Sequence, residues 1–320
     1  HGIGRRQRQM CIRDSDETGD PFPDKTLEVC KSSDAILFGA IGDPKYDNDP
    51  NAKVRPEQGL LALRKALNLY CNVRPVTIYD SLIDSSPLKR NRIEGVDLVI
   101  YRELTGGIYF GEKKEMNDRG FASDLCTYNK EEILRVAHLA FKAAGKRKNK
   151  LTLVDKANVL ASSRLWRSVV TELHSSEYKH IDLDFLFVDN AAMQMVLNPA
   201  QFDVILTGNL FGDIISDEAS VIGGSIGLLA SASIGDRYAM FEPIHGSFPH
   251  GKGKGIANPT ATILSAAMML DNFNMVEEAN AIRIAVQKTI DNSVGTLDLF
   301  PEKSFTTSEV GSYISNIISQ

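Results

Sequence analysis

The chain has 320 residues, more than one hydrophobic core comfortably supports, so one large domain or two closely joined domains are expected. Its 36 Lys and Arg against 41 Asp and Glu give a formal net charge of −5. This mildly acidic balance argues against a nucleic-acid partner, whose phosphates need a basic face. Hydrophobic residues make up 43% of the chain, yet no apolar run approaches the ~20 residues that span a bilayer. We therefore expect a globular protein that binds neither nucleic acid nor membrane.

The four cysteines, Cys11, Cys30, Cys71 and Cys126, are scattered without the Cys-x-x-Cys spacing of a thiolate metal site. Such a distribution is typical of ordinary thiols in a reducing compartment. The N-terminus also lacks the apolar core of a signal peptide. These features predict a cytoplasmic protein.

Taken in chain order, the sequence begins with a polar, arginine-rich segment, residues 1–18, in which no regular element is expected. From Asp34 onward, apolar strand patterns alternate with helical patterns. The predicted strands cover 34–41, 96–101, 151–154, 182–188 and 203–207. The predicted helices cover 59–69, 130–144, a stretch from about Gly212, 257–270 and 276–290. This alternation predicts an α/β fold with a largely parallel sheet covered by helices on both faces.

Polar residues follow several of these strands directly. In an open α/β sheet, ligands bind beyond the carboxyl ends of the strands. The residues concerned are Arg102, Asp155, Lys156, Asp189, Asn209 and Asp213. We expect them to contribute to one shared site.

The segment NLFGDIISDEAS, residues 209–220, carries Asp213 and Asp217 four positions apart at a predicted helix start. This spacing places both carboxylates on one helix face, where a divalent cation can offset their repulsion. Mg²⁺ suits one or two carboxylates together with substrate oxygens and water. Acids also favour a helix N-terminus because of its dipole. We favour the metal site because the motif follows a buried strand, and Asp189 is a candidate third ligand.

Three arginines, Arg64, Arg74 and Arg102, form a second set of candidates. A guanidinium binds a carboxylate through two parallel hydrogen bonds, so three converging arginines would suit a dicarboxylate. Taken singly, each is more often a surface charge or a structural ion pair. Arg102 is the strongest candidate because it closes a buried strand.

Two residues could transfer protons. Lys156 lies at a strand end beside Asp155 and could act as a base if partly desolvated. Tyr109 follows a glycine pair that would allow a ligand to approach closely. Considered alone, a lysine or a tyrosine of this kind is more often structural.

The cofactor signal is indirect. No Gly-x-Gly-x-x-Gly follows a first strand, so the common dinucleotide fingerprint is absent from the sequence. Instead, the glycine-rich segment EPIHGSFPHGKGKGIANP, residues 242–259, leads into a predicted helix. Backbone N–H groups and a helix N-terminus can bind a pyrophosphate, although a surface loop has the same composition.

Together these segments resemble the isocitrate/isopropylmalate dehydrogenase family. The resemblance runs from about Gly19 to the C-terminus. Its motifs, in order, are GDPFPD, RPEQGLLALRK, NVRP, SPLK, RELTGGIYFGE, VDKANVL, FVDNAAMQ, NLFGDIISDEAS, GLLASASIG, FEPIHGS and GKGIANPTA. It implies the α/β fold of that family, with two mixed-to-parallel sheet domains and a cleft between them.

The resemblance also implies a domain division. Residues 19–70 together with 224–320 would form the cofactor-side domain, and 71–223 the substrate, metal and dimerisation domain. Residues 1–18 would lie outside the family pattern, so that the first strand, helix and strand of the cofactor domain are missing.

The activity implied is oxidation and decarboxylation of (2R,3S)-3-isopropylmalate to 2-oxoisocaproate with reduction of NAD, a step of leucine biosynthesis. The implied catalytic residues are Lys156 as base and Tyr109 as proton donor. The implied substrate residues are Arg64, Arg74, Arg102, Asp189, Leu60 and Leu61, and the implied Mg²⁺ or Mn²⁺ ligands are Asp189, Asp213 and Asp217. Family members are homodimers with shared active sites, so Lys156 and some of the aspartates would come from the partner subunit.

For NAD, the resemblance places Glu57 near the nicotinamide end and a loop around the adenosine half. The loop residues are His245, Gly246, Ser247, Phe248, Pro249, His250, Gly253, Ile256, Ala257 and Asn258. His250 stands where the family usually has an aspartate that accepts the ribose hydroxyls. We therefore expect NAD to be preferred over NADP, but by a reduced margin.

Substrate choice is predicted from Leu60 and Leu61, one helical turn before Arg64, which would form an apolar wall suited to an isopropyl group. The isocitrate branch has polar residues there. The alternatives are a tartrate, homoisocitrate or isocitrate dehydrogenase, and an inactive remnant or binding protein, which the unusual first 18 residues keep open.

Overall fold

The computed structural model describes residues 19–42 and 56–320. The expectations for residues 1–18 lie outside these ranges, as do residues 43–55. Among the helices of the described ranges, none is both long and apolar enough to cross a membrane.

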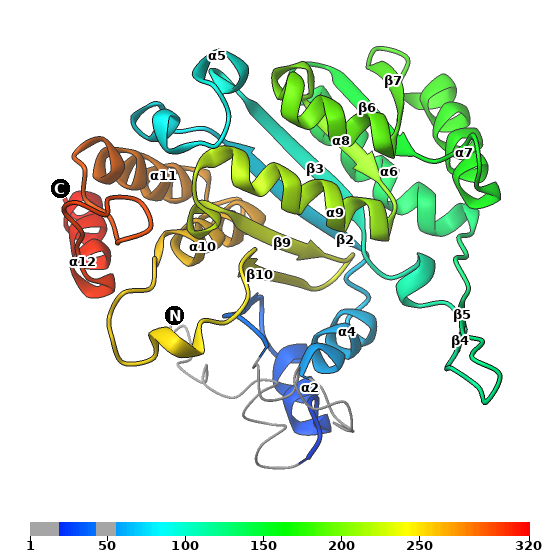
Figure 1. Ribbon diagram of the computed structural model, residues 1–320, viewed down its shortest axis with the longest axis horizontal. Helices are drawn as coiled ribbons and strands as arrows, with labels where there is room; N and C mark the ends of the chain where they lie inside the picture. Colours follow the sequence, from blue (N-terminus) through cyan, green and yellow to red (C-terminus); the bar gives the residue numbers. More distant parts are fainter. Residues whose placement is uncertain (1–18, 43–55) are drawn as a thin grey trace.

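Within these two ranges, eight strands form a mixed sheet at the centre of the fold (Figure 1). Its strands, in spatial order, are β1 (Ile36–Leu37), β10 (Ala239–Pro243), β9 (Ala230–Ile234), β2 (Cys71–Thr77), β3 (Asp97–Glu103), β8 (Val204–Thr207), β6 (Lys150–Asp155) and β7 (Asp182–Phe187). From β3 to β7 all neighbours are parallel, as predicted, whereas β2 pairs antiparallel with both β3 and β9, and β9 antiparallel with β10. The pairing of β2 with β9 joins the two expected domains in one continuous sheet, so their boundary stays a prediction.

The two faces of the sheet are covered by different helices. Helices α6 (Lys130–Gly145) and α7 (Ala161–Glu177) pack on the face that carries Val99, Leu153 and Leu206. Helices α8 (Val188–Leu197) and α9 (Asn209–Ser220) pack on the face that carries Leu98, Ile100 and Ile205. Successive strand residues point to opposite faces, so one apolar run supplies both cores.

The remaining helices surround the β9–β10 end of the sheet. Helix α10 (Thr260–Asn272) lies against β9 and β10, and α11 (Val276–Asp291) and α12 (Thr307–Ile318) follow it outward. Helices α2 (Asp24–Lys31) and α4 (Pro56–Ala66) lie near β1, and a short helix α5 (Arg90–Ile93) precedes β3. A hairpin of β4 (Lys113–Lys114) and β5 (Ser123–Asp124) projects from the body of the molecule (Figure 1).

Candidate active site

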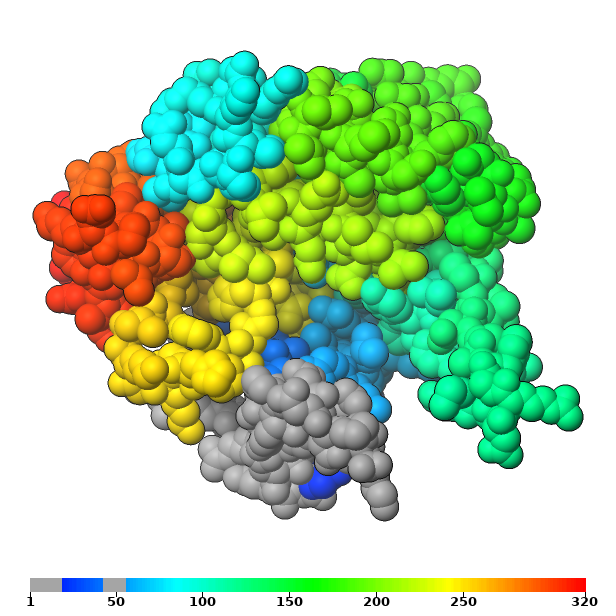
Figure 2. Space-filling model, in the orientation of Figure 1, coloured from blue at the N-terminus to red at the C-terminus, as the bar shows by residue number. Residues whose placement is uncertain are grey.

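A cavity of about 440 Å³ opens between α4 on one side and α9 on the other. The space-filling view shows the surface hollowed between these two helices (Figure 2). Residues of β2, β3, β9 and β10 complete its lining. The site thus lies at the join between the two predicted domains.

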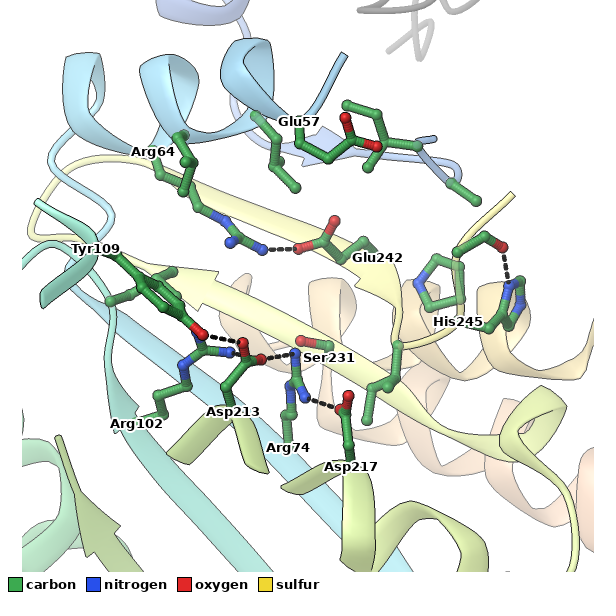
Figure 3. A pocket seen from close by; sticks show the side chains of 18 of the residues that line it. Glu57, Arg64, Arg74, Arg102, Tyr109, Asp213, Asp217, Ser231, Glu242 and His245 are labelled. Carbon is green, nitrogen blue, oxygen red and sulfur yellow. Dashed lines mark hydrogen bonds and ion pairs between the residues drawn. The ribbon is translucent and has the colours of Figure 1, made fainter. Parts of the chain in front are cut away.

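This cavity brings together many of the residues singled out from the sequence. They are Glu57, Leu60, Leu61, Arg64, Arg74, Arg102, Tyr109, Asn209, Asp213, Asp217, His245 and Gly246. Leu104, Ser231, Glu242 and Ile244 also line it and were not predicted. Figure 3 shows the charged side chains converging from opposite walls.

Arg74 and Arg102 come from the adjacent antiparallel strands β2 and β3 and are only 8% and 3% exposed. Arg102 Nη1 donates to Asp213 Oδ1 at 2.5 Å, and Arg74 Nη1 donates to Asp217 Oδ1 at 2.8 Å (Figure 3). Burial lowers the pKa of the Arg102 guanidinium to about 10, which leaves it charged at neutral pH. These two arginines and two aspartates therefore form one network of charges, which the 3.9 Å approach of Arg74 to Asp213 also joins.

Arg64 reaches the cavity from α4 and meets an unpredicted partner on β10. Its Nη2 lies 2.9 Å from Glu242 Oε1, and both side chains are nearly buried, at 11% and 9% exposure. Within the described part of the chain, its buried Nε has no hydrogen-bond partner. Glu242 is the first residue of the glycine-rich segment 242–259 and lies near the end of β10, and that position is the signal by which the sequence could have revealed it.

Tyr109 faces the carboxylate of Asp213, to which its hydroxyl donates a hydrogen bond of 2.8 Å. Burial works against ionisation of Asp213, but Arg102, the Tyr109 hydroxyl and Arg74 outweigh it and hold the pKa of this carboxyl below its usual range. Burial and the bond to Asp213 raise the pKa of Tyr109 to about 12. The phenol is therefore neutral and keeps its proton at physiological pH.

The turn that carries Tyr109 depends on a glycine. Gly107 has a φ of +73°, and a Cβ at this position would lie 2.3 Å from the hydroxyl of Tyr128. The hydroxyl of Tyr128 accepts a hydrogen bond of 2.8 Å from the backbone N–H of Asn209. The glycine pair thus lets the chain pass closely over the start of α9.

Asp213 and Asp217 present carboxylates from successive turns of one face of α9, as predicted. Hard oxygen donors from two carboxylates fit Mg²⁺ or Mn²⁺, which takes its remaining ligands from substrate and water. Asp189 does not join them, and no group of three His, Cys, Asp or Glu side chains within 19–42 and 56–320 meets in a way that could hold a metal ion. One chain therefore supplies two of the three predicted ligands to this cavity.

Lys156 and Asp189 are paired with each other, away from the cavity lining. Lys156 Nζ lies 2.6 Å from Asp189 Oδ1, just beyond the carboxyl ends of β6 and of the edge strand β7. The hydrogen bond from Lys156 lowers the pKa of the Asp189 carboxyl. The structure of one chain thus keeps the predicted base apart from the predicted arginines.

The predicted cofactor loop begins at the cavity and runs along the outside of the fold. His245 and Gly246 line the cavity, and the Ser247 hydroxyl donates to the carbonyl of Gly42. Phe248, Pro249, His250, Gly253, Ile256 and Ala257 lie farther along, outside the cavity lining. Asn258 closes the loop, because its side chain accepts from Thr260 N at the start of α10 and donates to Asp298.

The comparison with known proteins decides the family. The model of the family "Isocitrate/isopropylmalate dehydrogenase" matches residues 2–314. The chain belongs to this family.

Its similarity to individual relatives is high over most of both chains. It is 52% identical to a 3-isopropylmalate dehydrogenase of Bacteroides fragilis, over 97% of this chain and 88% of the relative. It is 54% identical to one of Clostridium acetobutylicum, over 93% and 85%. Among solved structures, isocitrate dehydrogenase from Methylococcus capsulatus matches with a TM-score of 0.86 and 33% identity, over 98% of this chain and 90% of that one. A β-decarboxylating dehydrogenase from Thermococcus kodakarensis matches with a TM-score of 0.77 and 36% identity, over 95% and 84%. The predicted fold class is thereby confirmed.

Proposed function

We propose that the chain oxidises and decarboxylates 3-isopropylmalate to 2-oxoisocaproate with reduction of NAD, as a step of leucine biosynthesis. The names of its relatives at 52–54% identity support this assignment. The observation that carries it is one cavity in which buried arginines stand beside an apolar wall.

That wall distinguishes the substrate within the family. Leu60 and Leu61 line the cavity together with Leu104 and Ile244, opposite Arg74. An isopropyl group can be buried against these side chains, whereas the third carboxylate of isocitrate would be desolvated there without a partner. A pocket of this kind discriminates by about 1–3 kcal/mol per methylene, which makes isocitrate and tartrate poorer substrates.

The chemistry follows from the residue types. Arg74 and Arg102 hold the substrate carboxylates, and Asp213 and Asp217 hold the divalent ion. When bound, that ion supplies positive charge at the substrate oxygen, and NAD accepts the hydride. Lys156 removes the proton of the C2 hydroxyl as hydride leaves C2. Once C2 is a ketone, the carboxylate on C3 departs as CO₂, and Tyr109 gives its proton to C3.

Two features support a homodimer in which the partner subunit's Lys156 completes each site. First, Lys156 and Asp189 lie outside the cavity formed by their own chain. Second, α8 and α9 pack together and leave large apolar side chains exposed, including Met193 at 56% and Ile214 at 54%. Large apolar side chains exposed on two helices that pack together are typical of an interaction site. A second copy of the chain would cover it and bring a lysine to the cavity.

The cofactor proposed is NAD, bound by the loop from His245 to Asn258 with Glu57 near the nicotinamide. His250 offers no anionic acceptor to the ribose hydroxyls, so the preference for NAD over NADP is expected to be modest. The metal proposed is Mg²⁺ or Mn²⁺, and a cytoplasmic location stays a prediction from the sequence.

An assay of NADH formation tests the proposal, with Mg²⁺ present and 3-isopropylmalate, isocitrate, homoisocitrate and tartrate compared as substrates. We expect the highest kcat/KM for 3-isopropylmalate and loss of activity when the metal is chelated. A higher kcat/KM for any of the other three acids would contradict the assignment. Activity that survives chelation would contradict the role of Asp213 and Asp217.

A further inference from the structure

Two fully buried asparagines contact the two arginines that the proposed function assigns to the substrate. Asn72 lies on β2 two residues before Arg74, so both side chains point to the same face of the strand. Asn72 Oδ1 accepts a hydrogen bond of 2.8 Å from Arg74 Nε. This contact occupies one edge of the Arg74 guanidinium and leaves Nη1 to Ser216 and Asp217.

Arg102 has a matching partner on the other side of the site. Asn209 is the first residue of α9, directly beyond β8, whose Thr207 is in register with Arg102. Asn209 Oδ1 accepts from Arg102 Nε at 3.1 Å and from Arg102 Nη2 at 2.7 Å. The remaining Nη1 faces Asp213.

The orientation of each amide group is fixed by its own nitrogen. Asn72 Nδ2 donates to the carbonyl of Ala232 at 3.1 Å, and also to Ser231 Oγ at 2.8 Å. Asn209 Nδ2 donates to the carbonyl of Gly106 at 3.0 Å. A backbone carbonyl only accepts, so the amide oxygen must be the end that faces the guanidinium. The exposed fractions are 0% for Asn72 and 1% for Asn209, so both amides depend on these protein partners for their hydrogen bonds.

An amide oxygen differs from a carboxylate in its effect on charge. Among the described residues, the cavity lining holds four carboxylates, those of Glu57, Asp213, Asp217 and Glu242, and three arginines. A dianionic substrate can bind only where some positive charge is left to it. A neutral acceptor holds a guanidinium in place without neutralising it, whereas a buried carboxylate would form an ion pair with it.

We propose that Asn72 and Asn209 are positioning residues, which fix Arg74 and Arg102 in the orientation that receives the substrate carboxylates and leave their charge available. The proposal rests on the assignment of both arginines to a dicarboxylate substrate. Its consequence is a specific one: a negative charge at either asparagine weakens binding of the anionic substrate and does not weaken binding of the metal cation.

The test compares Asn72→Asp and Asn209→Asp with the wild-type enzyme. The matched control is Asn129→Asp, the same substitution at the exposed N-cap of α6, where an aspartate accepts the hydrogen bond from Glu132 N equally well. Three dissociation constants are measured directly: 3-isopropylmalate and Mg²⁺ by calorimetry, and NADH by fluorescence. Asn72→Ala and Asn209→Ala are included because they remove the amide without adding charge.

We expect both aspartate variants to raise the Kd of 3-isopropylmalate by about tenfold or more, with the Kd of NADH within about twofold and that of Mg²⁺ unchanged or lower. The alanine variants are expected to raise the Kd of 3-isopropylmalate by a smaller factor, and Asn129→Asp to leave all three constants unchanged. If an aspartate variant does not fold, the alanine variant at the same position tests the proposal: its Kd for 3-isopropylmalate should rise, and its Kd for NADH should stay within about twofold of the wild-type value.

Wild-type affinity for 3-isopropylmalate in these variants would overturn the proposal, and so would a parallel loss of NADH and Mg²⁺ binding, which indicates general damage. Failure of the wild-type enzyme itself to bind or oxidise 3-isopropylmalate would instead refute the proposed function. The two failures are therefore distinguishable.

Discussion

The hydroxyl of Tyr109 donates a 2.8 Å hydrogen bond to Asp213, so the proposed proton donor and a proposed metal ligand are in direct contact. Asp213 also accepts from Arg102, which ties Tyr109 to the arginines of the site. The neutral phenol, with its pKa raised to about 12, is suited to give a proton and not to remove one.

Removal of this hydroxyl tests its role. Tyr109→Phe keeps the ring and deletes the proton, so kcat for 3-isopropylmalate should fall by about 10²–10⁴-fold, the usual contribution of general acid–base catalysis. KM should change little, because the carboxylates of the substrate bind the arginines. Steady-state kinetics with product analysis measure this. An unchanged kcat would show that another group protonates the carbon.

Arg102 should not tolerate replacement by lysine. Its guanidinium bridges Asn209 and Asp213 through separate nitrogens, and a single ammonium cannot reproduce that fork. We expect Arg102→Lys to lower kcat/KM by about 10²-fold or more, which corresponds to about 2.7 kcal/mol of lost interaction. Arg90→Lys is the matched control, because Arg90 is half exposed and pairs with Asp84 on the surface. Equal effects of the two substitutions would contradict the account.

The apolar wall can be tested with a substrate that lacks the branch. Leu60→Ser removes apolar surface at the place proposed for the isopropyl group. Its kcat/KM for 3-isopropylmalate should fall by about 5–150-fold, equivalent to about 1–3 kcal/mol. The value for malate, which has no isopropyl group, should change little. A matching loss for both acids would place the isopropyl group elsewhere.

Cofactor choice should respond to His250. In the wild-type enzyme we expect kcat/KM to be higher with NAD than with NADP, by a modest factor. His250→Asp restores an anionic acceptor for the ribose hydroxyls and repels a 2′-phosphate, so it should widen that ratio. Kinetics with both cofactors measure the ratio in the two proteins. A wild-type preference for NADP would contradict the assignment.

Sequence patterns predicted the parallel half of the sheet and overlooked the antiparallel part. Strands β6, β7 and β8 are apolar runs and were found close to their observed bounds. Strand β2 was overlooked because it contains Asn72, Arg74 and Pro75, and β9 because its sequence is ASASI. Both strands contribute residues to the hydrophobic core, but polar and small residues interrupt them, so neither shows the hydrophobic periodicity that marks a strand.

The sequence also predicted most of the charged residues of the candidate site, but not all of the contacts between them. Arg102 and Asp213 were predicted because they lie at or after a strand, Tyr109 because it follows a glycine pair, and Arg74 as one of three arginines suited to a dicarboxylate. The cavity brings all four together. The pairing of Arg64 with Glu242 was not predictable, because 178 residues separate them and a single sequence contains no signal for such a contact. Within one chain Lys156 is paired with Asp189, which the sequence could not show either.

The central claim is that each active site combines the arginines and Asp213 of one subunit with Lys156 of its partner, and subunit complementation tests it most directly. Lys156→Ala and Asp213→Asn are purified separately, each as a dimer without measurable NADH formation from 3-isopropylmalate. They are then unfolded, mixed in equal amounts and refolded together. Half of the dimers should be mixed, and each mixed dimer should contain one intact site, so about a quarter of the wild-type activity should return. A mixture that forms mixed dimers yet stays inactive would contradict the shared site, as would full activity of the Lys156→Ala protein on its own.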